Sequence, residues 1–310
     1  MVSEEGHQTI ILQNFFQRLF KRHNLAEEVM KKIKRIAYLG TDFFSGCLDA
    51  LVAAGYEIPW IYTGQSKLFQ HNEHILAVAE QQQTKVFKDK ISAYELEFLA
   101  AEGCDLVISA AYPHQIPAFE TAPRMINIYP ELLPRGRSPW PLPWVILNNL
   151  QVSGVTIHKV SPQIDGGDLL AQLTFSISER GNLESLSCKV QMKAPDLLLE
   201  VLKKFDDYWE NALPQQDGEY WPMPNEKERT LDWNLPVAEL DKIARAFGKS
   251  GSYAFFDEQK WKTEDIAVWA EPHRHKPGTV VLRNGSEVVI AATDGYVCLR
   301  FFQPVLKEEK

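Results

Sequence analysis

A short stretch in the middle of the chain brings an amide and two guanidinium groups into a proline-rich loop. It reads INIYPELLPRGRSPWP over residues 126–141. Asn127 ends an apolar run, where a side-chain amide needs hydrogen-bond partners, and Arg135 and Arg137 are suited to holding an anionic ligand. The prolines fix the backbone locally, so a stiff surface loop would have the same composition. We interpret the stretch as a candidate catalytic loop.

A second candidate is the turn QIDGGD at residues 163–168. Its two carboxylates, Asp165 and Asp168, flank a pair of glycines that lets the backbone approach a ligand closely. An ordinary acidic turn before the apolar run LLAQLTF would also fit this sequence. The turn alone therefore leaves both interpretations open.

Three other motifs are weaker. GTDFFSG at 40–46 joins a predicted strand to a predicted helix, where backbone N–H groups can hold an anion, but an ordinary turn is as consistent with it. It matches neither GxGxxG nor a P-loop. The histidine pairs at 71–74 and 273–275 have no obvious third ligand nearby, so we predict no metal site.

Alternating strands and helices must position these loops. From Arg35 onwards short apolar runs alternate with amphipathic segments, which predicts an α/β domain with a parallel sheet covered by helices. The expected strands are residues 35–40, 57–64, 84–88 and 105–112, and the expected helices are 45–56, 72–83 and 92–103. Ligand sites in such sheets lie at the carboxyl ends of the strands, where the candidate loops begin.

The rest of the chain has a different composition and a different pattern of predicted elements. A helix is predicted around 190–207, followed by a Pro-, Gly- and Gln-rich linker, then a helix and several short strands typical of a small β-barrel. Residues 8–31 predict helices that pack on their own domain or form an oligomer contact. The predicted organisation is an N-terminal extension (1–32), a catalytic domain (33–209), a linker (210–228) and a C-terminal domain (229–310).

Composition narrows the class of protein. The 310 residues are 45% hydrophobic and 24% charged, with a net charge of −8, which is typical of a globular protein and unfavourable for a nucleic-acid partner. The four cysteines are far apart, as expected in a reducing cytoplasm. Neither a signal peptide nor an apolar run long enough to cross a membrane is evident.

At the loop and the acidic turn the sequence resembles the folate-dependent formyltransferases, and is closest to the methionyl-tRNA formyltransferase-like and sugar N-formyltransferase proteins. Their signature is Asn-x-His-Pro-Ser-Leu-Leu-Pro followed by Arg-Gly, then Gly-Val-Thr and Asp-x-Gly-Asp. The chain reads Asn127-Ile-Tyr129-Pro-Glu131-Leu-Leu-Pro134, Arg137-Ser138, Gly154-Val-Thr156 and Asp165-Gly-Gly-Asp168. The resemblance extends over roughly 33 to 305 and implies a Rossmann-like domain followed by an OB-like domain.

The resemblance also implies a reaction, in which 10-formyltetrahydrofolate as co-substrate gives its formyl group to a primary amine. It implies that Asn127, Tyr129 and Asp165 form the catalytic centre, with Asn127 donating to the oxyanion and Asp165 assisting proton transfer. The folate would contact Tyr112, His114, Gln115, Ile116, Val160, Ser161, Pro162 and Gln163. The amine substrate would contact Gly40, Thr41, Asp42, Arg135 and Arg137.

Three positions depart from the signature, namely Tyr129 for His, Glu131 for Ser and Ser138 for Gly. A phenol with a pKa of about 10 is neutral at physiological pH and has one proton to donate, so Tyr129 cannot serve both the oxyanion and Asp165. Losing one such donor costs about 100- to 1,000-fold in rate. His114, or His158 in the strand before Asp165, is a candidate to approach the centre instead.

Two principal functions follow. One is a formyltransferase, slowed by Tyr129; the alternative is a catalytically impaired homologue that binds folate or another ligand. A nicotinamide-dependent oxidoreductase is less consistent with the missing GxGxxG. Residues 222–310 carry 13 Lys and Arg against 14 Asp and Glu. This balance favours a small amine, such as an amino-sugar nucleotide or an amino acid, over tRNA.

Overall fold

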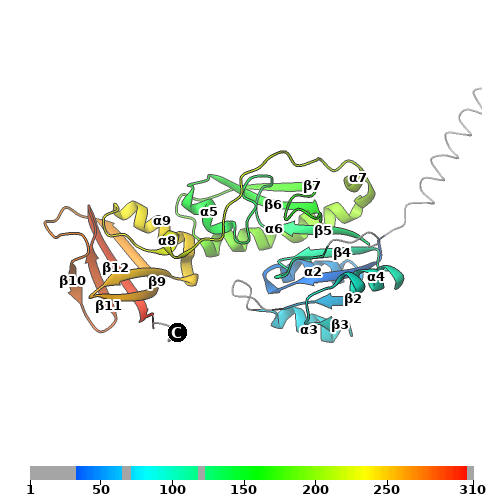
Figure 1. Cartoon of the computed structure of the whole chain (residues 1–310), viewed down its shortest axis with the longest axis horizontal. Helices are drawn as coiled ribbons and strands as arrows, with labels where there is room; N and C mark the ends of the chain where they lie inside the picture. The colour runs from blue at the N-terminus through cyan, green and yellow to red at the C-terminus, as the bar shows by residue number, and fades with distance from the viewer. Residues whose placement is uncertain (1–32, 65–70, 118–122, 306–310) are drawn as a thin grey trace, which may run out of the picture. The chain divides into compact units, whose positions relative to one another are not determined.

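The computed structural model describes residues 33–64, 71–117 and 123–305 (Figure 1). The chain divides into two units, Met1–Lys34 and Arg35–Lys310. The helices predicted at 8–31, and the oligomer contact proposed for them, lie outside the described residues. Among the described residues, no helix has the length and apolar character needed to span a membrane.

Seven strands form a mostly parallel sheet in the order β3-β2-β1-β4-β5-β6-β7. They are β1 (Arg35–Gly40), β2 (Glu57–Tyr62), β3 (Lys85–Phe87), β4 (Leu106–Ala110), β5 (Arg124–Tyr129), β6 (Val152–Lys159) and β7 (Leu169–Ser176). The first five are mutually parallel, as the alternating pattern predicts, whereas β6 runs antiparallel to both β5 and β7. The predicted Rossmann-like α/β class is confirmed.

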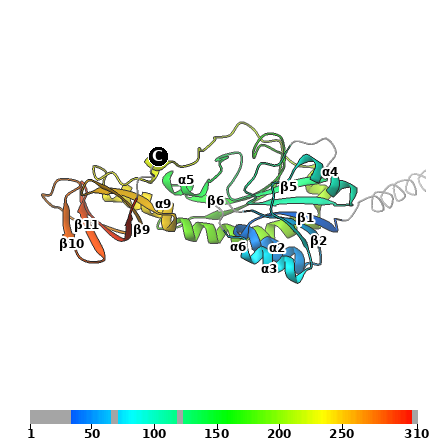
Figure 2. The same ribbon diagram turned by 60° about the horizontal axis from the view of Figure 1, so that its bottom comes forward.

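Helices cover the sheet because each buries an apolar stripe. The helices are α2 (Ser45–Ala53), α3 (Glu73–Gln81), α4 (Ala93–Ala101), α5 (Leu142–Leu147), α6 (Leu183–Lys203) and α7 (Phe205–Glu210). α2, α3 and α6 lie on one side of the sheet and α4 on the other (Figure 2). On α6, Leu186, Val190 and Leu197 are buried at helical spacing, which packs this helix against β6 and β7.

The C-terminal part contains a five-stranded antiparallel sheet in the order β10-β11-β12-β9-β8. Its strands are β8 (Ser252–Phe256), β9 (Gln259–Ala270), β10 (Val280–Arg283), β11 (Glu287–Ala291) and β12 (Gly295–Pro304). The short helix α8 (Glu226–Arg229) precedes it, and α9 (Val237–Phe247) packs on β9 and β12. A small β domain at this position was predicted. Among the described residues its sheet is open, because the two edge strands, β10 and β8, do not pair with each other.

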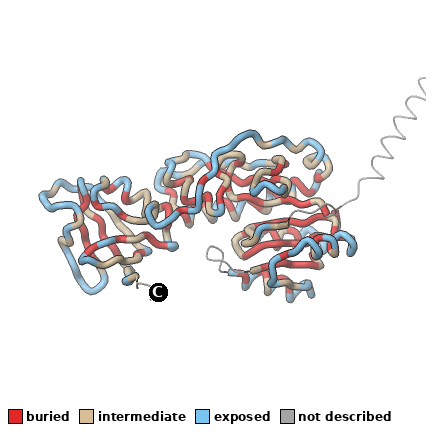
Figure 3. The backbone as a smooth tube through the Cα atoms, viewed as in Figure 1, coloured by how far each residue is buried: buried red, intermediate tan, exposed pale blue. Residues whose placement is uncertain are grey.

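Buried positions follow the strands of both sheets (Figure 3). In the N-terminal sheet, Ala37 and Leu39 of β1 join the core beneath α4, and the alternate residues Ile36 and Tyr38 are fully buried as well. A strand with both faces buried belongs in the middle of a covered parallel sheet. This places the carboxyl ends of β1, β4 and β5 side by side, where their loops form one site.

Candidate active site

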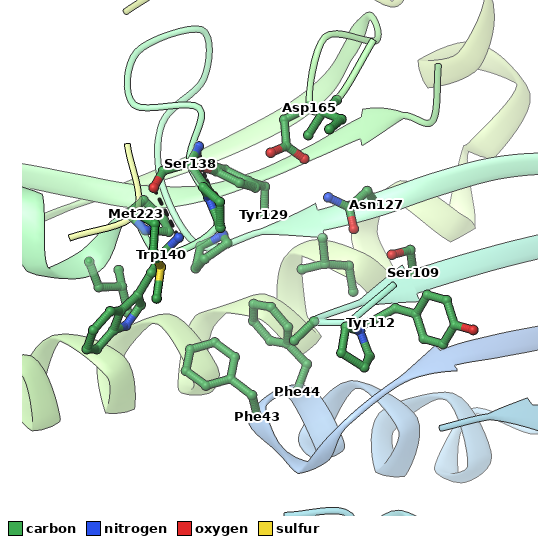
Figure 4. A pocket seen from close by; sticks show the side chains of 18 of the residues that line it. Phe43, Phe44, Ser109, Tyr112, Asn127, Tyr129, Ser138, Trp140, Asp165 and Met223 are labelled. Carbon is green, nitrogen blue, oxygen red and sulfur yellow. Dashed lines mark hydrogen bonds between the residues drawn. The ribbon is translucent and has the colours of Figure 1, made fainter. Parts of the chain in front are cut away.

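A cavity of about 1,120 Å³ opens at the carboxyl edge of the parallel sheet (Figure 4). The predicted catalytic residues Asn127, Tyr129 and Asp165 all line it, together with Ser109 from the neighbouring strand and His158 from β6. Asn127 and Asp165 direct their polar groups into the same space. The two motifs that the sequence separates by nearly forty residues therefore form one site.

His158 joins the two motifs. The antiparallel register of β5 and β6 places it directly opposite Asn127, and its Nε2 lies 3.0 Å from Asn127 Nδ2. Its Nδ1 lies 2.8 Å from the Lys159 carbonyl oxygen, so Nδ1 carries the proton and Nε2 accepts from the amide. Burial lowers the pKa of His158 to about 4, so the ring is neutral and fixes which way the Asn127 amide points.

Asp165 supplies the carboxylate of the site. Its Oδ1 lies 3.9 Å from His158 Nε2, too far for a hydrogen bond, and the neutral ring provides no charge to pair with it. Burial raises the pKa of Asp165 to about 6, and the nearby Arg137 guanidinium acts in the opposite direction. The group is thus a carboxylate at neutral pH and a stronger base than an exposed aspartate.

Tyr129 has its hydroxyl engaged outside the reaction centre. The phenol donates to the Gly136 carbonyl oxygen at 2.6 Å and accepts from the Ser138 backbone N–H at 2.7 Å. Burial raises its pKa well above the usual value, so it remains neutral. The sequence left two destinations for its single proton, Asp165 or the oxyanion, and the structure shows a third, the backbone of the following loop.

Glu131, the second departure from the signature, is fully buried. It accepts hydrogen bonds from the Ser153 hydroxyl and from Arg135, whose Nη2 lies 3.1 Å away, and burial raises its pKa. Arg135 is therefore the ion-pair partner of a residue within its own loop. Neither Arg135 nor Arg137 is among the described residues that line the cavity, in contrast to their predicted role as substrate contacts.

Residues 40–42 also have structural partners. The Asp42 carboxylate accepts from the backbone N–H groups of His74 and Ile75, in the first turn of α3, while the Thr41 hydroxyl donates to Ala111 O. A Cβ on Gly40 would lie 2.5 Å from Ala110 O. The next two residues, Phe43 and Phe44, line the cavity instead, which the sequence did not predict.

Comparison with known proteins identifies the family. The formyl transferase domain matches residues 61–202, and the C-terminal domain of formyl transferases matches residues 225–309. Together these matches cover most of the chain, in the order expected. The chain belongs to the formyltransferase family.

Individual relatives agree with this assignment. Methionyl-tRNA formyltransferase of Chloroflexus aurantiacus is 29% identical over 81% of this chain and 86% of its own length. Among solved structures, HypX from Aquifex aeolicus in complex with tetrahydrofolic acid is similar to this chain with a TM-score of 0.69 at 21% identity. The match covers 89% of this chain, but the chain spans less than half of HypX (45%).

The N-formyltransferase from Helicobacter canadensis, in complex with folinic acid and dTDP-3-aminofucose, has a TM-score of 0.61 at 16% identity. That match covers 88% of this chain and the whole of the enzyme (100%). At these identities the solved structures establish the fold, and the formyltransferase family recognised from the sequence is confirmed.

In this formyltransferase, the predicted folate contacts form one wall of the cavity. All eight residues line it: Tyr112, His114, Gln115, Ile116, Val160, Ser161, Pro162 and Gln163. The Tyr112 hydroxyl accepts from the Ile91 backbone N–H at 2.9 Å, and its ring meets that of His114 edge to face. His114, the other candidate to replace the missing histidine, lies on this wall.

The opposite end of the cavity contains residues that the sequence analysis missed. Trp140, near the end of the catalytic loop, and Met223 lie close together (Figure 4), and Arg229, Lys249 and Tyr253 continue the lining into the C-terminal part. The Trp140 ring contacts Phe247 at the end of α9 with centroids 5.9 Å apart. A tryptophan directly after the Arg-Gly-Arg-Ser-Pro run was the available signal. Within the described residues, no group of three or more potential metal ligands is present.

Proposed function

We propose that this protein transfers the formyl group of 10-formyltetrahydrofolate to a primary amine, using Asn127 and Asp165 and without catalytic help from Tyr129. The observation that carries the proposal is the convergence of Asn127, His158 and Asp165 in one cavity, next to a wall suited to a flat heteroaromatic ligand. Family membership supports the reaction class, and the geometry supports the assignment of roles.

The cavity fits the folate by size and lining. Its volume of about 1,120 Å³ is slightly above the usual range of small-molecule sites, which leaves room for a folate and an acceptor, and its wall combines aromatic, aliphatic and amide side chains. Residues 112–116 and 160–163 would hold the folate. Bound there, 10-formyltetrahydrofolate supplies a formyl group whose bond to N10 breaks as the amine nitrogen bonds to the formyl carbon. HypX and the Helicobacter enzyme were both solved with folates.

Asn127 acts as the hydrogen-bond donor to the formyl oxygen. Its Nδ2 has two protons, and His158 Nε2 accepts only one of them. The other is available to the oxygen on which negative charge develops. Because the neutral His158 ring is itself fixed by the Lys159 carbonyl, the amide is oriented before the reaction begins, which is the condition for effective electrostatic stabilisation.

Asp165 acts as the base that removes a proton from the amine. A carboxyl with a pKa of about 6 is ionised at neutral pH and is closer to the operating pH than an ordinary aspartate, which favours proton transfer. Neither of the two described residues nearest to the role of the family histidine supplies its positive charge, since His158 is neutral and Tyr129 is a phenol with its hydroxyl engaged. We therefore expect slower transfer than in a formyltransferase with a second donor, by about 100- to 1,000-fold.

The acceptor is an amine whose remainder extends from the centre towards the C-terminal part. Phe43, Phe44 and Trp140 provide apolar surface, and Lys249 lies further along the lining. We propose a small amine that carries an anionic group, such as an amino-sugar nucleotide. Methionyl-tRNA is the second candidate acceptor, because relatives of this chain are named methionyl-tRNA formyltransferases. The nearly balanced charge of residues 222–310 makes tRNA the less favoured of the two. The cytoplasmic location stays a prediction from the sequence.

Formyl transfer and folate binding, measured separately, test the proposal. Wild type should bind 5-formyltetrahydrofolate by calorimetry and should formylate at least one member of a panel of amino-sugar nucleotides, amino acids and methionyl-tRNA. Asp165→Asn should keep the binding and lose the transfer. Asp168→Asn is the matched control, because this second carboxylate pairs with Lys159 at 3.0 Å and does not line the cavity.

Folate binding without transfer to any acceptor would favour the alternative, a ligand-binding member of the family. Absence of folate binding would overturn the proposed transfer and would leave, of the alternative, only the binding of another ligand.

A further inference from the structure

The segment between the two domains lies along the loops of the active site. Residues 210–228 were predicted to be a linker, yet Leu213 and Leu169 exchange backbone hydrogen bonds of 2.8 and 2.9 Å. Further on, Gly136 N donates to Glu219 O, and Trp221 N donates to Arg137 O, both at 2.9 Å. The segment is therefore bonded both to the start of β7 and to the catalytic loop.

Gln215, in the middle of this segment, bridges the two site loops. Its Nε2 donates to the carbonyl oxygens of Asp165 at 2.9 Å and of Gly167 at 2.6 Å. Its Oε1 accepts from Arg137 Nη2 at 2.8 Å and from Arg137 Nε at 3.2 Å. Both ends of one amide are thus committed, one to the loop of Asp165 and the other to the loop after Tyr129.

The loop of Asp165 requires such support. Asp165 has a φ of +50°, a left-handed conformation that is unfavourable for a residue other than glycine and that persists when its surroundings hold it. The adjoining Gly167 packs so closely that a Cβ there would lie 1.9 Å from Lys159 O. The carbonyl groups on either side of Gly166 are those that Gln215 binds.

Arg137 is held in turn by the residue that replaces the family histidine. Tyr129 bonds to the backbone on both sides of Arg137, at Gly136 O and Ser138 N. A continuous series of hydrogen bonds therefore runs from Tyr129 through the loop to Arg137, to Gln215 and to Asp165. In this chain hydrogen bonds therefore link the tyrosine to the loop of the carboxylate residue by an indirect route.

We propose that Gln215 is a positioning residue, which holds Asp165 in place through the two hydrogen bonds that it donates and which is itself oriented by Arg137. This inference rests on the proposed function, because it assigns Gln215 to the transfer reaction. Gln215 is not itself among the described residues that line the cavity, and it reaches the site through its hydrogen bond to Asp165, so its influence is on the placement of that residue.

Gln215→Glu tests the proposal, because a carboxylate still accepts from Arg137 but has no proton for the two carbonyl groups. Gln172→Glu is the matched control, since Gln172 Nε2 also donates to two acceptors, Leu133 O and Thr156 Oγ1, and makes no hydrogen bond to the loop of Asp165. We expect Gln215→Glu to lower kcat about 10- to 100-fold while KM for the formyl donor changes little, the pattern of a misplaced catalytic group. Gln172→Glu should keep kcat.

Hydrogen exchange over residues 160–168 provides a readout that needs no turnover. Exchange in this segment should be faster in Gln215→Glu than in Gln172→Glu or wild type, because the loop has lost its support. Gln215→Met, which is similar in size and has no polar end, should reproduce both effects and replaces the glutamate variant if that variant does not fold.

A folded Gln215 variant with wild-type kcat and wild-type exchange would overturn the proposal. Inactive wild type would instead contradict the proposed function, and the exchange measurement would still decide whether Gln215 holds the loop.

Discussion

Replacing Tyr129 with phenylalanine separates the two roles that this residue could have. The substitution removes only the hydroxyl, whose partners are Gly136 O and Ser138 N, from a side chain that is 4% exposed. An unsatisfied buried polar group costs about 1–3 kcal/mol, so leaving both partners unsatisfied should lower the free energy of unfolding by about 2–6 kcal/mol. With an unfolding entropy of about 2.1 cal/mol/K per residue, that corresponds to a decrease in Tm of about 3–9 °C.

The same substitution should have little effect on catalysis. Because the hydroxyl does not face the reaction centre, kcat measured well below the unfolding transition should fall by less than about tenfold, equivalent to 1.4 kcal/mol. A direct donor to the oxyanion would instead cost about 100- to 1,000-fold. The control is Tyr208→Phe, whose hydroxyl donates to Glu200 at the surface and whose loss should cost about 1 kcal/mol or less.

Thermal unfolding and steady-state formyl transfer on the same preparations give both numbers. A Tyr129→Phe protein that unfolds like wild type but has lost two orders of magnitude in kcat, on the scale of an oxyanion donor, would refute the structural role.

Three further expectations follow from the site and its loops. In a pH–rate profile, kcat/KM should fall as the pH drops through about 6, because Asp165 must be ionised and its pKa is about 6. His158, with a pKa of about 4, adds no further step near neutral pH. Arg137→Gln should move this fall in kcat/KM to higher pH and leave the acceptor KM unchanged, and a raised KM with no such move would restore the anion-binding role predicted from the sequence. Gly136→Ala should destabilise the fold by about 1–3 kcal/mol in thermal unfolding, because its Cβ would lie 2.5 Å from the Trp221 ring at a φ of +71°, whereas Gly285→Ala, with no atom near its Cβ, should be neutral.

The sequence was most informative where local pattern and burial coincide. Apolar runs such as that of β4 (Leu106–Ala110) identified the strands, and the rule that ligands bind at the carboxyl ends of parallel strands located Asn127. The folate contacts were expected only from the resemblance to the formyltransferases, and the structure places residues 112–116 and 160–163 just after the ends of β4 and β6. The antiparallel direction of β6 was not evident, since this strand is buried on both faces as a parallel strand would be.

What the sequence left open depends on hydrogen bonds between distant residues. The sequence shows that residue 129 is a tyrosine. Which group accepts its hydroxyl proton depends on the conformation of the loop seven to nine residues further along the chain. Gln215 is separated from Asp165 by 50 positions in a segment whose composition indicated only a linker. Arg135 was predicted to bind an anionic ligand, because it lies in a loop with a second arginine. Instead it forms an ion pair with Glu131, whose burial no sequence pattern indicated.

A crystal structure with a stable analogue of 10-formyltetrahydrofolate would test the central claim most directly. We predict the formyl oxygen within hydrogen-bond distance of Asn127 Nδ2, about 3 Å, with the pterin against residues 112–116 and the Tyr129 hydroxyl still bonded to Gly136 O. A folate bound elsewhere, or a Tyr129 hydroxyl that turns to contact the formyl group, would contradict it.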